Sequence, residues 1–304
     1  MNKRSILVNR HPILNNKRVK TGLMLLIFIV VFCFLGPFLS PYELGETNLL
    51  HAGQPPSIEH WLGTDKAGRD VLLRLMIGGR LSLIVGFAVV AVEIFLGTVI
   101  GLVSGYYGGW IDNMLMRFVD VVFSIPFLPV LLLASAVMSE LQVSPDQRIY
   151  LMMLIIGMFS WPYIARLVRG QAMTVIEQEF ILAAQALGAS DSRRIFRHLL
   201  PNIIPQVIVA GTLGMAGAIM TETVLSYLGL GILPPFPSWG NMVQAVNDFN
   251  DFRYRMWLWL PPGGAIFLTV ISVNLIGDGL RDLFDPREKT EFCTDQPFKR
   301  GENI

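Results

Sequence analysis

Six apolar segments constrain the fold of this chain more than any other feature of its sequence. They are expected at about 22–39, 81–105, 119–138, 150–168, 203–228 and 258–280. A helix of about 20 apolar residues crosses the hydrocarbon core of a bilayer, and it satisfies its own backbone polar groups there. Charged residues make up only 15% of the chain, whereas a typical soluble domain has about 25%. The sequence therefore predicts an all-α, polytopic membrane protein with six transmembrane helices.

The distribution of basic residues predicts the orientation. If the N-terminus is cytoplasmic, an even number of spans returns the C-terminus to the cytoplasm. With this topology 17 of the 24 Lys and Arg residues lie on the inner side and 7 on the outer side, as the positive-inside rule requires. We expect a short cytoplasmic segment at 1–20, a transmembrane domain at 21–287 and a cytoplasmic tail at 288–304. Cys33 and Cys293 lie far apart in this topology, so no disulfide is expected.

The loop between the fourth and fifth spans, residues 179–205, reads as two short helices. Residues 180–187 are compatible with a helix, and Gly188 suits the left-handed position that follows a helix end. Ser190 is a good N-cap for a second helix.

The second helix of this loop carries apolar and basic side chains together. Its expected apolar face is made of Ile195, Phe196, Leu199 and Leu200, with Arg193, Arg194 and Arg197 largely elsewhere. Pro201 is expected to end the helix. An apolar and basic helix pair in a water-exposed loop predicts a docking site for another protein.

Two carboxylates lie in the middle of expected spans, where facing lipid would cost several kcal/mol. Glu222 in the fifth span shares a helical face with Ser226. These two residues could line a path for a solute, or Glu222 could be a hydrogen-bonded packing residue; the sequence leaves both interpretations open. For Glu93 in the second span the packing interpretation is favoured, because its neighbours include Val89, Val90, Ile94 and Gly97.

Glycine and proline give further expectations about the spans. Gly86, Gly97, Gly101 and Gly105 in the second span should permit close helix packing. Kinks are predicted at Pro126 and Pro129 in the third span, and at Trp161-Pro162 in the fourth.

The expected outer segments, 41–79 and 228–259, also carry local signals. Thr64 or Asp65 could cap an amphipathic helix with the i,i+4 pairs Asp65–Arg69 and Asp70–Arg74. Gly78-Gly79 would then bend the chain into the second span. Tryptophan is typical of the lipid headgroup boundary, so that placement is expected of Trp239, Trp257 and Trp259.

Several kinds of chemistry are absent from the sequence. No phosphate-binding GxxxxGK[ST] motif is found, so the chain is not expected to hydrolyse ATP itself. The histidines are scattered and no HExxH or GxSxG pattern occurs, which argues against a zinc site or a serine hydrolase. Basic residues at membrane edges do not indicate nucleic-acid binding. We therefore expect no catalytic residue, cofactor or metal in this chain.

The 179–205 loop resembles the EAA motif of permease subunits of ABC importers, E-A-A-x3-G-x9-I-x-L-P. Ala183-Ala184, Gly188 and Leu200-Pro201 fall in register with that motif. Two positions depart from it: Leu182 stands at the acidic position and His198 at the isoleucine position. Glu179 is close enough in sequence to supply the missing carboxylate.

Four further blocks narrow the resemblance to the peptide/nickel class of these permeases. They are WLGTDKAGRDVLLRLMIGGRLSL, GYYGGWIDNMLMRFVDVVFSIPFL, LSYLGLGILPPFPSWGNMV and LPPGGAIFLTVISVNLIGDGLRDLFDP. The chain looks most like the second permease subunit of oligopeptide and dipeptide systems, over roughly residues 20 to 287.

This resemblance implies a type I ABC importer permease fold in a bacterial plasma membrane. It also implies three kinds of partner: a homologous permease that forms a heterodimer, two cytoplasmic ATPases that bind ATP and Mg, and an extracytoplasmic binding protein. The implied ATPase contact is the coupling segment Leu182, Ala183, Ala184, Gly188, Ser190, Arg193, Arg194, Ile195, Phe196, Arg197, His198, Leu200 and Pro201. Segments 61–80 and 230–250 are the candidate docking surface for the binding protein.

Two alternatives remain open at this point. The same architecture could import nickel or another small solute, because nothing in the spans selects the ligand. An ion-coupled secondary carrier could use Glu93 and Glu222 to carry protons, but that interpretation leaves the loop at 179–205 unexplained.

Overall fold

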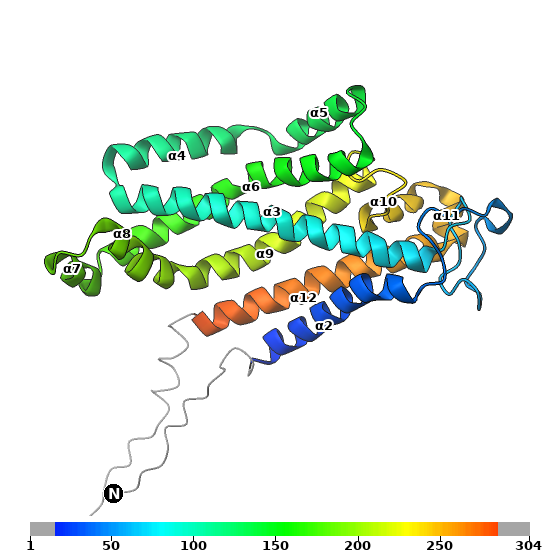
Figure 1. Cartoon of the computed structure of the whole chain (residues 1–304), viewed down its shortest axis with the longest axis horizontal. Coiled ribbons are helices and arrows are strands. Elements are labelled where there is room, and N and C mark those ends of the chain that lie inside the picture. The colour runs from blue at the N-terminus through cyan, green and yellow to red at the C-terminus, as the bar shows by residue number, and fades with distance from the viewer. Residues whose placement is uncertain (1–15, 285–304) are drawn as a thin grey trace, which may run out of the picture.

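A computed structural model describes residues 16–284 and has a bundle of long helices (Figure 1). Five helical segments are long and apolar enough to cross a membrane, and a sixth crossing is possible if the bent pair α4 and α5 is one span. The predicted all-α architecture is confirmed. The long helices are α2 (Lys17–Leu35), α3 (Val71–Tyr107), α4 (Gly109–Ser124), α5 (Phe127–Glu140), α6 (Pro145–Ile176), α9 (Leu200–Tyr227) and α12 (Leu260–Phe284).

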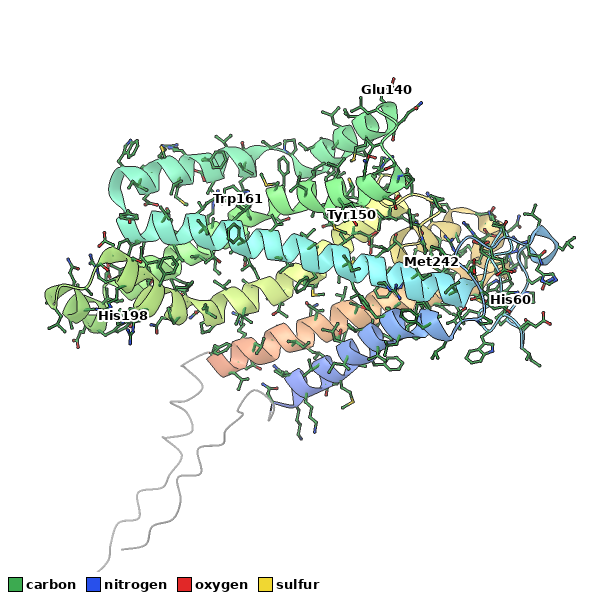
Figure 2. The ribbon with its side chains drawn as sticks, in the orientation of Figure 1. His60, Glu140, Tyr150, Trp161, His198 and Met242 are labelled. Atoms are coloured by element: carbon green, nitrogen blue, oxygen red, sulfur yellow. The ribbon has the colours of Figure 1, made fainter. Side chains whose placement is uncertain are left out.

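Short helices occupy the two ends of the bundle (Figure 1). At one end lie α7 (Glu179–Ala186), α8 (Asp191–Arg193) and the π-helical turn η3 (Arg194–Leu199); we call residues 179–199 the hairpin. At the other end lie η2 (Leu49–His51), α10 (Trp239–Val243), η4 (Gln244–Asn247), α11 (Phe249–Tyr254) and η5 (Met256–Leu258), while η1 (Gly36–Leu39) follows α2. Figure 2 places His198 at the hairpin end, and His60 and Met242 at the α10–α11 end.

Helix α3 packs along α6 through a stripe of glycines. A Cβ atom added at Gly97 would lie 2.5 Å from the Cβ of Ile164, and one added at Gly105 would lie 2.6 Å from the Cβ of Ala172. These separations are well below van der Waals contact, so the two helices approach too closely for any side chain there. The predicted close packing of the second span is confirmed at these positions.

The third crossing is broken rather than gently kinked. Helix α4 ends at Ser124, and α5 starts after Pro126 at an angle of 69° to it. Proline has no backbone N–H and its ring disfavours a helical conformation of the preceding residue, so the predicted kink at Pro126 becomes a break. Pro129 lies in the first turn of α5, where the missing N–H has no helical partner to lose. Pro162 lies inside α6, and it does not interrupt that helix.

The start of α3 corrects the prediction of an amphipathic interfacial helix beginning at Thr64 or Asp65. Asp70 is the N-cap, and its side chain accepts a hydrogen bond from the backbone N–H of Leu73 at 2.7 Å. The predicted Asp65–Arg69 pair is present at 2.7 Å. Arg74 pairs with Asp65 at 3.4 Å instead of with Asp70, because Asp70 is engaged as the cap.

The predicted bend at Gly78-Gly79 is also wrong. Helix α3 continues without interruption through both residues, which instead leave room for α10 and its N-cap. A Cβ atom on Gly79 would lie 2.4 Å from the ring of Trp239, and that tryptophan is fully buried with its indole N–H donating to the carbonyl oxygen of Leu75. Trp239 is therefore a core residue, in contrast to the headgroup position expected for it.

Pro201 does not end the hairpin's second helix as predicted. The chain continues without a break from the π-helical turn into α9, with Pro201 in the first turn of α9. The N–H of Leu200 bonds to the carbonyl of Ile195, five residues back. Proline has no backbone N–H to donate, and a wide turn of this kind shifts the hydrogen-bond register immediately before Pro201.

The described ends of the chain lie together on the same side of the bundle. The side-chain amide of Asn16 donates to the carbonyl of Gly279 at 3.3 Å, and Arg18 pairs with Asp282 at 2.9 Å. Both ends point toward the half of the molecule that carries the hairpin (Figure 1). An even number of crossings is consistent with this placement.

Candidate functional site

The hairpin is a well-capped structure with the local features that its sequence predicts. Gly188 has a φ of +77°, which confirms the left-handed turn between the two helices. The side chain of Ser190 accepts a hydrogen bond from the backbone N–H of Arg193, which confirms the N-cap. The hairpin therefore has a defined shape that it can present to a partner.

Two apolar side chains anchor the hairpin to the bundle. Ile181 and Leu199 are buried in one core cluster with residues of α3, α6 and α9, including Val168 and Ile203. The sequence missed Ile181 and assigned Leu199 to the outer apolar face, which is wrong. Leu199 points inward because the π-helical turn adds a residue before α9 and rotates the face.

The outer side of the hairpin exposes large apolar side chains. Phe196 is 66% exposed and Leu187 is 88% exposed. Phe180 and Ala183 on α7 and Leu187, its C-cap residue, follow each other at spacings of three and four residues, so they lie on one side of the helix. Leu182 is also exposed, and Leu187 is a contact candidate that the sequence did not single out.

The three arginines of the hairpin have different environments. Arg193 and Arg197 are exposed. Arg194 donates to the carboxylate of Asp191 and lies over the ring of Tyr106, whose hydroxyl donates to the same carboxylate at 3.0 Å. Arg194 therefore joins the hairpin to the end of α3, and only the other two arginines offer their charge to a partner.

The remaining predicted coupling residues lie on the same unit. Ala183 is exposed and Ala184 is partly buried; Ile195 and His198 are also partly buried. The carbonyl oxygen of His198 accepts a hydrogen bond from the side chain of Asn202 at 2.6 Å. Leu200 and Pro201 form the first turn of α9, so the predicted segment connects directly to a span.

Inside the bundle, Glu222 is enclosed by hydroxyl donors. Its side chain accepts hydrogen bonds from Ser82 at 2.9 Å and from Ser226 at 2.6 Å, and the residue is 3% exposed. The backbone N–H of Ile232 donates to the Ser226 oxygen at 3.0 Å. The space beside Glu222 has a volume of about 10 Å³, room for one water at most. Of the two interpretations of Glu222 and Ser226, this geometry favours packing.

Glu93 has the opposite environment. It is 5% exposed and borders a cavity of about 390 Å³ between α3, α6, α9 and the break between α4 and α5. The sequence favours a packing role for Glu93. The residue is buried in the bundle as expected, but its carboxylate borders an open space, so packing does not account for that group.

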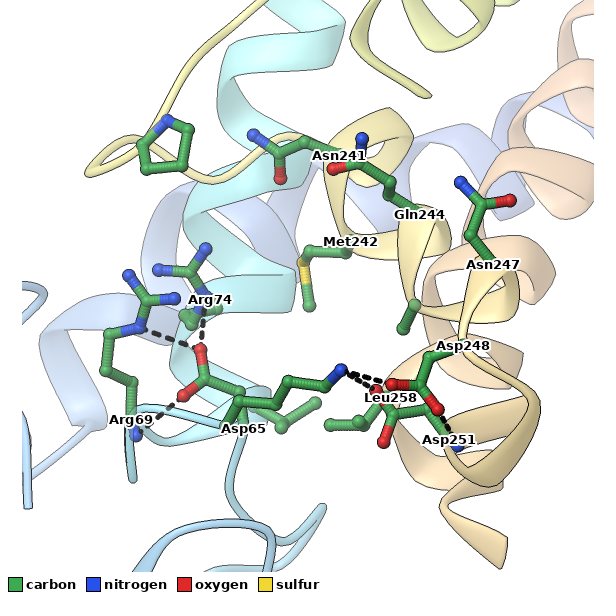
Figure 3. Close-up of a pocket in the computed structure, with 14 residues that line it drawn as sticks. Asp65, Arg69, Arg74, Asn241, Met242, Gln244, Asn247, Asp248, Asp251 and Leu258 are labelled. Carbon is green, nitrogen blue, oxygen red and sulfur yellow. Dashed lines mark hydrogen bonds and ion pairs between the residues drawn. The ribbon is translucent and has the colours of Figure 1, made fainter. Parts of the chain in front are cut away.

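A larger cavity of about 570 Å³ lies at the α10–α11 end (Figure 3). Arg69 and Arg74 line one side and Asp248 and Asp251 the other. Lys66 pairs with both aspartates at 2.8 Å. The hydrogen bond from Lys66 holds the pKa of the Asp248 carboxyl below its usual value, and the same bond raises the pKa of Lys66.

Metal binding is not indicated by side-chain placement in the part of the chain that the structure covers. Within residues 16–284 no group of three or more His, Cys, Asp or Glu side chains is arranged to hold an ion. His60 pairs with Asp70 at 2.9 Å and is buried, which accounts for it as a structural residue.

These features define a polytopic helical membrane protein with a capped hairpin that exposes apolar side chains at one end and a polar cavity at the other. The chain belongs to the family described as the binding-protein-dependent transport system inner membrane component, which matches residues 97–290. Residues 11–56 match the N-terminal transmembrane domain of oligopeptide transport permease C. The predicted permease fold of this family is thereby confirmed.

Relatives with peptide-transport names align over most of the chain. The oligopeptide transport system permease protein OppC of Bacillus subtilis is 37% identical over 90% of this chain and 87% of its own length. The dipeptide transport system permease protein DppC of Alkalihalophilus pseudofirmus is 39% identical, over 90% and 88%. OppC of Haemophilus influenzae is 36% identical, over 90% and 86%.

Proposed function

We propose that this chain is the membrane-spanning translocation subunit of an ATP-driven importer for short peptides. Family membership and the names of relatives that cover 90% of the chain support this function. In this proposal the chain pairs with a homologous permease in a bacterial inner membrane, and a binding protein delivers the peptide. ATP and Mg bind to two separate ATPase subunits, since the chain has no phosphate-binding motif of its own.

The hairpin is the proposed contact with the ATPase, and its exposed apolar side chains are the observation that carries this proposal. Phe180, Leu187 and Phe196 would bury against a groove of the partner, with Arg193 and Arg197 at the rim. Burying such side chains is worth about 1.5–3 kcal/mol each. A water-exposed loop has no reason to carry them unless a partner covers them.

The anchoring of the hairpin suggests how it would transmit motion. Ile181 and Leu199 are packed among the spans, and the π-helical turn continues into α9. A displacement of the hairpin by the ATPases would therefore move α6 and α9 with it, and the site would alternate between outward and inward openings.

The two departures from the EAA motif define where this contact would be unusual. Leu182 is exposed, so an apolar contact could replace a charged one at that position. Glu179 is exposed three residues earlier, in the first turn of α7. Residues three apart are neighbours on a helix surface, so Glu179 can place a carboxylate near the same spot. His198 lies at the other departure and is partly buried.

The proposed orientation puts the hairpin and both termini in the cytoplasm and the α10–α11 end outside, where the binding protein would dock. Single cysteines at exposed positions test it, with Cys33 and Cys293 replaced by serine and without coexpressed ATPases: Leu187→Cys on the hairpin and Ile58→Cys at the other end. A membrane-impermeant maleimide should label the Ile58→Cys variant in intact cells and the Leu187→Cys variant only after permeabilisation. The reverse pattern would exclude this orientation.

A matched pair of phenylalanines tests the docking of the ATPase. Phe196 on the hairpin is 66% exposed and Phe249 on α11 is 67% exposed, so an aspartate at either site meets similar solvent access. We expect Phe196→Asp to abolish co-purification of the coexpressed ATPases and peptide uptake, because a charge would enter an apolar groove. Phe249→Asp should retain the ATPases.

Three results would count against the proposal. If Phe196→Asp retains ATPase binding and uptake, the hairpin is not the contact. If both variants lose the ATPases, the effect is a general loss of folding. If the intact transporter with its binding protein takes up no peptide but does take up a nickel chelate, the architecture stands and the solute is different.

A further inference from the structure

The cavity beside Glu93 has walls of an unusual composition. Four of its lining residues are aromatic: Phe123, Phe127, Phe159 and Tyr163. Other parts of its wall come from α9, where Gly214, Gly217, Ala218 and Thr221 border it. A Cβ atom added to Gly214 would lie 3.1 Å from a carboxylate oxygen of Glu93, and one added to Gly217 would meet no atom within 4 Å. The absence of side chains on this face of α9 is what leaves the space open.

Among the described residues, Glu93 is the one acidic residue that lines this cavity. Across residues 16–284 its carboxylate has neither a hydrogen bond nor an ion pair. A buried charged or polar group without a partner is costly in an apolar environment. The carboxylate is thus an acceptor that a ligand in the cavity would satisfy.

The aromatic residues favour a cation in this cavity. The faces of aromatic rings attract ammonium and guanidinium groups. One aromatic ring in the wall of this cavity already contacts a guanidinium group. The guanidinium of Arg166 lies over Phe123, 4.4 Å from the ring centroid. Arg166 itself forms an ion pair with Asp120 at 2.7 Å. Its positive charge is therefore balanced by Asp120 and not by Glu93.

The residues that line the cavity favour an organic ammonium group over a metal ion. A divalent metal needs several oxygen, nitrogen or sulfur ligands, and the cavity supplies one carboxylate and a few hydroxyl groups. An organic ammonium group needs one carboxylate and apolar or aromatic surroundings. The volume of about 390 Å³ falls in the range of small-molecule sites, about 300–1,000 Å³.

We infer that this cavity receives the N-terminal ammonium group of a peptide in transit, with Glu93 as its acceptor and the aromatic residues around it. This inference rests on the proposed function, and it names a contact that the chain itself makes with the solute. Glu93 would then lie on the translocation path, while Glu222 would hold the helices beside it together.

The test compares a tripeptide with a free N-terminus and the same tripeptide with an N-terminal acetyl group, which removes the charge. Binding is measured first on the purified complex of this chain, its partner permease and the ATPases, without the binding protein, so that delivery plays no part. At millimolar concentration the free tripeptide should raise the thermal unfolding midpoint of the wild-type complex, and the acetylated one should not. Glu93→Gln keeps the size of the side chain but removes its charge and should abolish the shift.

Uptake into proteoliposomes that contain the complete system gives the second readout. Loss of a charge-assisted contact should lower uptake of the free tripeptide at subsaturating concentration about tenfold or more in Glu93→Gln. Glu140→Gln is the matched control, because Glu140 is an exposed carboxylate at the end of α5. That variant should behave as wild type in both measurements.

The outcomes separate this inference from the proposed function. If the free and acetylated tripeptides shift the wild-type midpoint equally, or if neither shifts it, the ammonium site is excluded even where peptide uptake is normal. If Glu93→Gln lowers uptake only in the presence of a proton gradient, Glu93 carries protons and the inference is wrong. If the wild-type system transports no peptide at all, the proposed function fails.

Discussion

Glu93 and Glu222 are the same residue type, both are almost completely buried, and each lies within a helix long enough to cross the membrane. Their environments differ in what the neighbouring helices bring to them. Ser82 and Ser226 direct hydroxyl groups at Glu222, whereas Glu93 lies beside Gly214 and borders a cavity that is also lined by aromatic residues. The comparison teaches that burial alone does not show whether a carboxylate is satisfied by hydrogen bonds. The presence of donors around it does.

The largest expected effect on stability comes from removing the carboxylate of Glu222. Glu222→Ala should destabilise the protein by about 3 kcal/mol, because it leaves two buried hydroxyl groups unpaired and opens a cavity in a packed region. Thermal unfolding of the purified complex in detergent measures this loss. Glu93→Ala is the control and should cost less than about 1 kcal/mol, since its carboxylate has no partner to lose. Equal losses for the two variants would remove the distinction between them.

A smaller effect is expected from adding one methyl group near each carboxylate. A Cβ atom at Gly231 would lie 2.3 Å from the Ser226 oxygen, so Gly231→Ala should disturb the Glu222 network and cost about 1–3 kcal/mol. Gly217→Ala projects into open space near Glu93 and should leave stability unchanged or raise it slightly, because alanine favours a helix. The same unfolding assay compares them. A loss at Gly217 as large as that at Gly231 would mean that the cavity is not open.

The smallest effect concerns a carboxylate outside the spans, Asp248, which has a cation for a partner. Its pKa is lowered by the hydrogen bond from Lys66, so the stability it adds is present above its ordinary pKa and is lost as the pH falls through the lowered one. The pKa of Lys66 is raised, so its share persists at neutral pH and is lost only at high pH. Asp248→Asn should therefore be slightly less stable than wild type at neutral pH, and the difference should shrink in acid. A difference that grows in acid would contradict this assignment.

Much of the local structure follows from the sequence. The spans follow from the apolar segments, and the hairpin caps follow from Gly188 and Ser190. The close packing of α3 on α6 follows from glycine spacing. These predictions succeed because each depends on residues near one another in the chain, through a backbone conformation or a helical period.

The errors have a different origin. Gly79 looks like a hinge in the sequence, but its role is set by Trp239, about 160 positions away. An ordinary helical period predicts that Leu199 lies on the apolar face of the hairpin, but the π-helical turn rotates it into the core. Neither the distant partner nor the wide turn leaves a local signal.

The sequence by itself determined that this is a helical membrane protein with several spans and a capped hairpin, and that it carries no GxxxxGK[ST] motif. Those properties depend on segment length, periodicity and caps, which are local. Only the tertiary structure decided which buried carboxylate is satisfied and which faces a cavity. The sequence left Glu222 undecided and favoured packing for Glu93, and the structure places Glu222 within reach of Ser82, 140 residues away, and Glu93 at an open space. The environment of a buried charge is made by helices that meet only when the chain has folded, and so it cannot be read from one helix alone.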